Sequence, residues 1–172
     1  MVQSNLKEKE DLTVKSSDFL ISKITMKDNK AIIEYSTDDD FRTNDGKFKV
    51  KDEVTEDFKT IWQNALAIIT ELTPQLYKEV AALKINSISF EYNGDFLERV
   101  SIAVVWSIDD NGHVLNLNYN NYPIYKPEMA ETVVAISGKH EELLHEILKA
   151  AKAYMNGETR TKQTSLNLTV VK

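Results

Sequence analysis

Regular hydrophobic patterning begins near Asp18, after a polar lead-in without periodicity. From Phe19, two strands joined by a tight turn are predicted by the run FLISKITM, the dipeptide Asp28-Asn29 and the run KAIIEYS. Asn and Asp tolerate the left-handed backbone that such turns require. We therefore expect a flexible segment over residues 1–17 and a folded domain from residue 18.

The stretch from Thr37 to Glu53 is rich in Asp, Asn, Gly and Thr and breaks the alternation. It predicts an exposed insertion, although KFKVK within it is also compatible with a short edge strand. Its run Asp38-Asp39-Asp40 leaves a loose divalent-cation site open as an alternative to a solvated loop. An EF-hand is excluded, because placing Gly46 at the sixth loop position puts Phe41 at the first, where an oxygen ligand belongs.

Two long amphipathic helices are predicted by apolar residues at three- and four-residue steps. Thr55 is the expected N-cap of the first, which Thr73-Pro74 ends before a short helix to about Leu83. The second begins at Ser137 or Gly138 and ends at Asn156-Gly157, a typical left-handed C-cap. The apolar stripes contain Phe58, Ile61, Trp62, Ala65, Ile69 and Leu72 in the first helix, and Leu144, Ile147, Leu148, Ala151 and Tyr154 in the second.

Between these helices, the runs INSISFEY, FLERVSIAVVWSI and HVLNLNY predict a three-stranded meander with turns at Asn93-Gly94 and Asn111-Gly112. In its central strand one side is apolar, which predicts that this side faces the helices. That side carries Val100, Ile102, Val104, Trp106 and Ile108. We interpret both Trp62 and Trp106 as packing residues.

These elements predict one α+β domain over residues 18–158, with an antiparallel sheet of about five strands and the two main helices packed on one face. The sheet combines the N-terminal hairpin with the meander, and its other face is partly exposed or used in association. No internal repeat occurs at a period between about 20 and 50 residues, so a repeat architecture gains no support. Residues 159–172 form a tail beyond the domain.

The composition narrows the classes of function. The chain has no cysteine, which excludes disulfides, zinc knuckles and thiolate nucleophiles and fits a reducing compartment. Its net charge of −6 disfavours direct nucleic-acid binding. No signal-peptide pattern or membrane span is recognisable, so we expect a soluble cytoplasmic protein.

The sequence contains no complete catalytic or metal-binding motif. His140 and His145 are the first and last residues of the string HEELLH. Five helical steps rotate by about 140°, so the two imidazoles cannot reach one metal, and we expect two solvated histidines on a polar face. A phosphate-binding loop at Gly138-Lys139 would need a glycine at Val133. No G-x-S-x-G string is present. We therefore predict a non-enzymatic protein without cofactor or metal.

The stretch NLNYNNYPIY is unusually rich in Tyr and Asn. These residues combine flat stacking surfaces with adaptable hydrogen bonding, which suits nucleobases, sugars and protein partners. Candidate contact residues are therefore Tyr119, Asn120, Asn121, Tyr122 and Tyr125. The structural alternative is a sheet edge whose tyrosines cover the core and whose asparagines satisfy an irregular loop.

In the tail, Leu166, Leu168 and Val170 alternate as in a strand. Such a segment can add to the protein's own sheet, to a sister subunit or to a partner. The spacing of Gln163, Leu166 and Leu168 also resembles the short peptides that dock on the bacterial replicative sliding clamp, although the terminal aromatic residue is absent.

From Ile21 to Arg160, the order of hairpin, helix, meander and closing helix resembles small accessory proteins of bacteriophage early gene cassettes. The matching helix end contains Tyr154, Gly157 and Arg160. The resemblance implies a phage accessory protein and no catalytic residues. We expect a homo-oligomeric binding protein that sequesters a nucleotide-like small ligand or blocks a host defence protein. The alternative is an accessory factor of phage DNA replication or recombination that acts through protein contacts such as the clamp.

Overall fold

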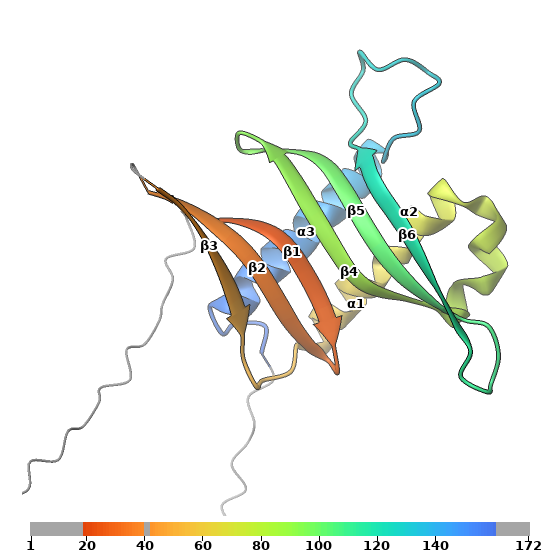
Figure 1. Ribbon diagram of the computed structural model, residues 1–172, viewed down its shortest axis with the longest axis horizontal. Coiled ribbons are helices and arrows are strands. Elements are labelled where there is room, and N and C mark those ends of the chain that lie inside the picture. Colours follow the sequence, from red (N-terminus) through yellow and green to blue (C-terminus); the bar gives the residue numbers. More distant parts are fainter. Residues whose placement is uncertain (1–18, 40–41, 161–172) are drawn as a thin grey trace, which may run out of the picture.

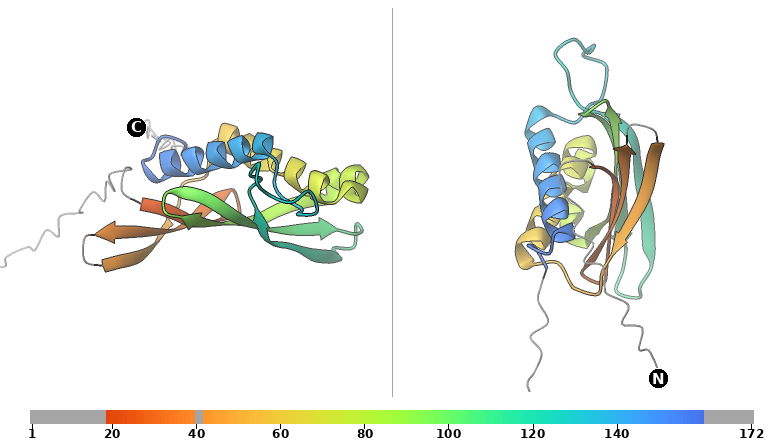
Figure 2. Two further views of the ribbon diagram at one scale, coloured as in Figure 1. Left: turned by 90° about the horizontal axis from the view of Figure 1, so that it is seen from above. Right: turned by 90° about the vertical axis from the view of Figure 1, so that its left-hand side faces the viewer.

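A computed structural model describes residues 19–39 and 42–160 of the chain. It confirms the α+β class: one antiparallel sheet has the strand order β3-β2-β1-β4-β5-β6, and the helices form a layer on one of its faces (Figures 1 and 2). The sheet has six strands where the pattern predicted about five. Within the described residues, none of the helices has the length and apolar character needed to cross a bilayer.

The additional strand comes from the segment that was predicted to be an insertion. β1 (Phe19–Lys27), β2 (Lys30–Asp39) and β3 (Arg42–Lys49) form an antiparallel meander. The expected exposed insertion is therefore wrong, and the alternative of an edge strand is confirmed, although the strand begins at Arg42 rather than Lys47. Its polar composition is that of an edge strand, where charged side chains prevent unwanted pairing. The predicted turn between β1 and β2 is confirmed, because Asp28 and Asn29 both have positive φ, at 50° and 60°.

The first predicted helix is present but divided. α1 (Glu56–Asn64) begins at Thr55, whose side chain accepts a hydrogen bond from the Phe58 amide, and α2 (Leu66–Leu72) follows after Ala65. The Ala65 and Ile68 amides donate to carbonyls only three residues back, which tightens the backbone and ends the regular α-helical ladder. The short helix after Pro74 is the 3₁₀-helix η1 (Pro74–Ala82).

The predicted meander and closing helix are confirmed as β4 (Leu83–Asn93), β5 (Phe96–Ser107), β6 (Val114–Pro123) and α3 (Gly138–Met155). Val100, Ile102 and Val104 are buried as expected. Trp106 is half-buried against the core, whereas Ile108 is 57% exposed because β5 ends one residue before it. The prediction that Ile108 is buried is therefore wrong.

The core fills the space between the sheet and the helices. Trp62, Phe58 and Tyr154 are among its largest fully buried side chains. Trp62 Nε1 donates a hydrogen bond to the Ile85 carbonyl at 3.2 Å, which joins α1 to β4. The predicted packing role of Trp62 is thus confirmed.

None of the described helices covers the opposite face of the sheet (Figure 2). Small side chains meet there across β4 and β5: Ser87 lies opposite Ala103, and Ser89 lies opposite Ser101. Between these two pairs, Ile88 of β4 lies opposite Ile102 of β5, and both isoleucines are buried on the helix side. Ser89, Ser101 and Ala103 are half-buried and Ser87 is 8% exposed, so the face without a helix is partly exposed, as expected.

Replacement of Trp62 tests the link between the helical layer and the sheet. We expect Trp62→Phe to lower the free energy of unfolding by about 1–3 kcal/mol, because it leaves a void and removes the donor from the buried Ile85 carbonyl. Equilibrium unfolding in urea measures the loss. Trp106→Phe is the matched control at a half-buried site, and an equal loss there would contradict this account.

Candidate functional site

The predicted Tyr and Asn stretch does not form a single surface. Tyr119 is only 9% exposed and its hydroxyl donates to Thr73 Oγ1 at 3.0 Å. The Tyr122 ring is half-buried on the same side, 6.1 Å from the Tyr119 ring between centroids. Asn120 and Asn121 are exposed. Tyr119 and Tyr122 therefore cover the core at the sheet edge, as the structural alternative anticipated.

A bulge at Asn121 explains why these two tyrosines share a side. Residues three apart in a regular strand point to opposite faces. The pairing of β5 with β6 shifts between Val100 and Ile102, and Asn121 adopts a left-handed φ of 57°. Its amide donates to Ser101 Oγ at 2.9 Å and its carbonyl accepts from Arg99 Nη1 at 3.3 Å. The extra residue returns Tyr122 to the helix side.

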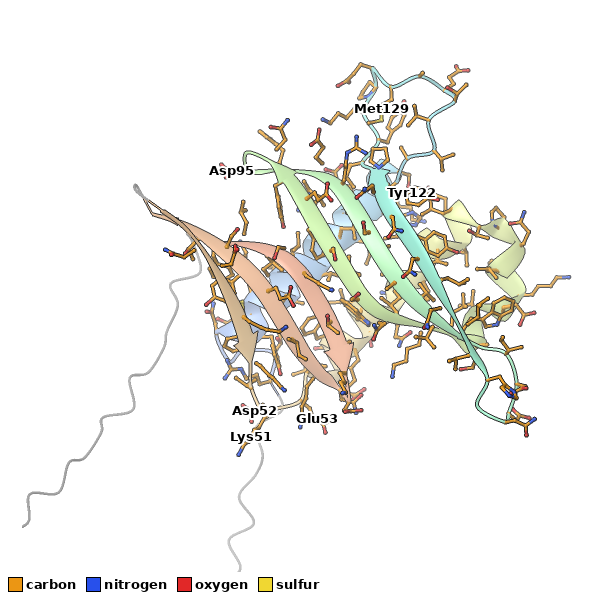
Figure 3. All side chains as sticks on the ribbon, in the orientation of Figure 1. Lys51, Asp52, Glu53, Asp95, Tyr122 and Met129 are labelled. Atoms are coloured by element: carbon orange, nitrogen blue, oxygen red, sulfur yellow. The ribbon has the colours of Figure 1, made fainter. Side chains whose placement is uncertain are left out.

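The last predicted contact residue, Tyr125, has a different setting. It lies beyond β6, is 53% exposed and lines a hollow of about 830 Å³ at one end of the molecule. We call this the end hollow; it is lined by residues 93–98 around the β4–β5 turn, residues 124–128, and Glu141 and His145 of α3. Figure 3 shows Asp95 of this turn at the same end of the molecule as the loop that carries Met129.

Phe96 is the second exposed aromatic residue of the end hollow, with 79% of its surface accessible. The sequence pattern predicted only that Phe96 begins a strand. A signal was available, because Phe96 and Leu97 are adjacent in one strand and cannot both face the core. Leu97 takes the buried position at 5% exposure, which leaves the Phe96 ring in solvent.

The loop after β6 is fixed at its base. Ile124 and Ile136 are buried and form a parallel bridge. The Tyr125 amide donates to the Ile136 carbonyl, and the Ile136 amide donates to the Pro123 carbonyl, each at 2.8 Å. Beyond this base the loop stands away from the sheet (Figure 1) and exposes Val133 and Val134. The anchored base holds Tyr125 at the rim of the end hollow.

The end hollow is acidic. Its lining contains the carboxylates of Asp95, Glu98, Glu128 and Glu141, against Lys126 and His145. His145 Nε2 lies 3.7 Å from Glu141 Oε1, and both side chains are exposed, so this contact leaves the excess of carboxylates in place. The local field therefore favours a cationic group over a phosphate.

A smaller hollow of about 490 Å³ adjoins the end hollow and shares Asp95 and His145 with it. Lys149 and Lys152 of α3 make its lining more basic. Tyr92 also lines it and donates its hydroxyl to the Ile21 carbonyl at 3.0 Å. Burial raises the pKa of Tyr92 to about 12, so the phenol stays protonated at neutral pH as a structural donor.

The two histidines of α3 lie in different settings. His140 is 6% exposed, in contrast to the solvated position predicted for it, because the start of α3 packs against α2: its Nδ1 lies 3.3 Å from Ser137 Oγ and 3.1 Å from Glu71 Oε2. His145 is exposed as expected. The part of the chain that the structure describes contains no cluster of three or more His, Cys, Asp or Glu side chains placed to bind a metal ion.

Several predicted segments lie outside the described residues. They include residues 1–17, the side chains of Asp38, Asp39 and Asp40, and the tail residues Gln163, Leu166 and Leu168. Comparison with protein-family models, with curated proteins and with solved structures found no match. The resemblance to bacteriophage accessory proteins therefore stays a prediction.

Substitutions at Asn121 test the bulge. We expect Asn121→Val to lower the free energy of unfolding by about 1–2 kcal/mol, because a β-branched residue resists positive φ. Asn121→Gly should stay within about 0.5 kcal/mol of the parent protein, since glycine adopts this conformation freely. Urea unfolding measures the free energy of unfolding of both variants. If both lose the same stability, the positive φ at residue 121 is not the cause of the loss.

The raised pKa of Tyr92 predicts a loss of stability at alkaline pH. Its stabilising contribution is complete below the ordinary tyrosine pKa near 10 and disappears as the pH rises through about 12. Between these values the parent protein should lose stability more steeply than Tyr92→Phe. Urea unfolding at stepped pH measures both slopes, and parallel slopes would contradict the assignment.

Proposed function

We propose that this protein is a non-enzymatic binding protein that docks a basic segment of a partner protein, with an apolar anchor, in the end hollow. The observation that carries the proposal is the pair of exposed aromatic rings, Phe96 and Tyr125, on one concave surface. Exposed apolar groups that gather on a concave surface with a polar rim are typical of interaction sites. Aromatic side chains in such positions often dominate binding free energy.

The charge of the hollow supports a protein partner over a nucleotide. Four carboxylates surround the two rings, and they attract Lys or Arg while repelling phosphates. A nucleotide would have to place its phosphates in the adjoining hollow near Lys149 and Lys152. Sequestration of a nucleotide-like ligand is therefore the less favoured form of the proposal.

The anchored loop adds a second contact region. Val133 and Val134 are 45% and 62% exposed on a compact loop whose ends are held together. Loops of this kind are frequently functional, because a rigid base presents their side chains at little further entropic cost. A host protein blocked by a phage accessory factor is one partner that fits this chemistry. The alternative role at the sliding clamp depends on residues 163–168, which lie outside the described residues.

A peptide-display selection against the purified protein tests the proposal. Enriched peptides should combine Lys or Arg with an aromatic or large aliphatic residue, and their binding should weaken as salt concentration rises. Phe96→Ala and Tyr125→Ala should each weaken binding of a selected synthetic peptide at least about tenfold, equivalent to about 1.4 kcal/mol. Fluorescence anisotropy measures the affinities.

Tyr77→Ala is the matched control. Tyr77 is 75% exposed on η1 and lines a different hollow, so its removal should leave peptide binding unchanged. If Tyr77→Ala weakens binding as much as Tyr125→Ala, the end hollow is not the site. A thermal-shift screen with nucleotides and cyclic dinucleotides tests the alternative, sequestration of a nucleotide-like ligand. If one of these ligands raises Tm and Tyr125→Ala abolishes the increase, the ligand of the end hollow is a nucleotide and not a protein segment.

A further inference from the structure

We infer that the outer side of β6, from Val114 to Asn118, accepts an extended, uncharged segment of a partner protein as a seventh strand of the sheet. We call this surface the β6 edge. β6 lies at one end of the strand order, and among the described residues it pairs only with β5. The β6 edge starts at the β5–β6 turn, at the other end of β6 from the end hollow (Figure 1), so the inference is independent of the proposed function.

The backbone of the β6 edge points outward at every second residue. The Ile108 amide donates to the His113 carbonyl at 2.9 Å, so the backbone of His113 faces the β5 side. Hydrogen-bonded and non-hydrogen-bonded residue pairs alternate along an antiparallel ladder. The pairing continues without a shift up to the bulge, so the N–H and C=O groups of Val114, Asn116 and Asn118 point away from β5. Within the part of the chain that the structure describes, these groups have no hydrogen-bond partner.

The far end of β6 already accepts backbone pairing on its outer side. Ile136 donates its amide to the Pro123 carbonyl and accepts from the Tyr125 amide, each at 2.8 Å. The Ile124 amide points the other way and donates to the Glu98 carbonyl of β5 at 3.0 Å. Pairing on the outer side of β6 is therefore part of the fold where Ile136 lies, and the β6 edge offers the same groups unpaired.

The β6 edge lacks the features that normally block strand addition. Edge strands are commonly short, charged, interrupted by proline or a bulge, or covered by another element. β6 has ten residues without a charged side chain, and its proline and its bulge lie near its end, at Pro123 and Asn121. β3, at the other end of the sheet, carries the exposed charges of Asp45, Lys47 and Lys49. This difference indicates that β6 is the edge that is open to pairing.

The side chains next to the β6 edge define the chemistry of the added segment. Leu115 and Leu117 lie on the helix side, opposite residues of the core, and Leu115 is 44% exposed. Asn116 and Asn118 are exposed on the open side. A segment that alternates apolar and polar residues would cover the leucines with one set and hydrogen-bond the asparagine amides with the other. A charged residue would find no countercharge on β6.

The position of η1 favours a single strand over a second copy of the whole sheet. Thr73 immediately precedes η1 and accepts the Tyr119 hydroxyl at 3.0 Å, which places this end of the helical layer over β6. Figure 1 shows η1, in yellow-green, beyond β6, and Figure 2 shows it in the helical layer at the same end of the sheet. A second copy paired at this edge would bring its own helices into that space, whereas one added strand would lie beneath η1.

A peptide-display selection on the double variant Phe96→Ala, Tyr125→Ala separates this site from the end hollow. We expect enriched peptides to alternate apolar and uncharged polar residues and to bind the parent protein equally well. Two synthetic versions of one enriched peptide are then N-methylated, each at the opposite set of alternate residues, because only every second amide of an added strand faces β6. One version should bind the parent protein at least about tenfold more weakly, and the other should keep its affinity.

Asn118→Pro tests the same contact from the side of the protein. The amide of Asn118 points to solvent, where an edge strand tolerates proline, so this variant should fold and should bind the unmethylated peptide at least about tenfold more weakly. Leu117→Pro is the matched control for the direction of the backbone. Its amide faces β5, so this replacement should lower Tm, whereas Asn118→Pro should not.

Fluorescence anisotropy measures the affinities, and the methylated peptides give a result on the parent protein even if a proline variant fails to fold. Equal affinities of the two methylated peptides, or a selection without alternating segments, overturn the inference and leave the proposal for the end hollow intact. If sedimentation of the parent protein shows a dimer that Asn118→Pro dissociates, a second copy occupies the β6 edge and the inference is also overturned.

Discussion

The fold depends on the pairing of β1 with β4, which joins two similarly ordered halves at the centre of the sheet. Only three residue pairs form this seam, with Ile24 opposite Ile88 in the middle, and both isoleucines are completely buried. Each half contributes three strands followed by helical structure. The helices then cross the seam: Trp62 of α1 bonds to Ile85 in β4, while Tyr154 of α3 packs against Phe48 in β3. Each half is therefore held by the other.

This interlocking determines which surfaces remain for binding. The inward sides of the helices and of the sheet are occupied by the core, so the surfaces that remain are the sheet ends, the loops, the outer sides of the helices and the open face. The end hollow lies where the β4–β5 turn, the anchored loop and α3 meet, and its side chains come from segments far apart in the sequence. It joins two exposed aromatic rings with a surplus of carboxylates, which is the combination on which the proposal of a basic partner segment rests.

The two sheet edges differ in chemistry. β3 carries charged side chains and Gly46, whereas β6 carries none of the charged residue types and buries Tyr119 beneath α2 and η1 through the bond to Thr73. The closing helix ends beside β3, and Arg160 stacks on Phe48 there.

Local patterning alone determined the α+β class, the left-handed turn at Asp28-Asn29, the Thr55 cap and the inward face of β5, because each depends on neighbouring residues or on a simple period. It left the β3 segment open between an exposed insertion and a short edge strand, since a charged edge strand has the composition of a loop. It left Tyr119 and Tyr122 open between a binding surface and a cover over the core, because the bulge at Asn121, which returns Tyr122 to the side of Tyr119, has no signature in a simple period. Only the tertiary structure could bring Phe96, Tyr125 and the surrounding carboxylates together, because their proximity results from sheet register and helix packing between distant segments.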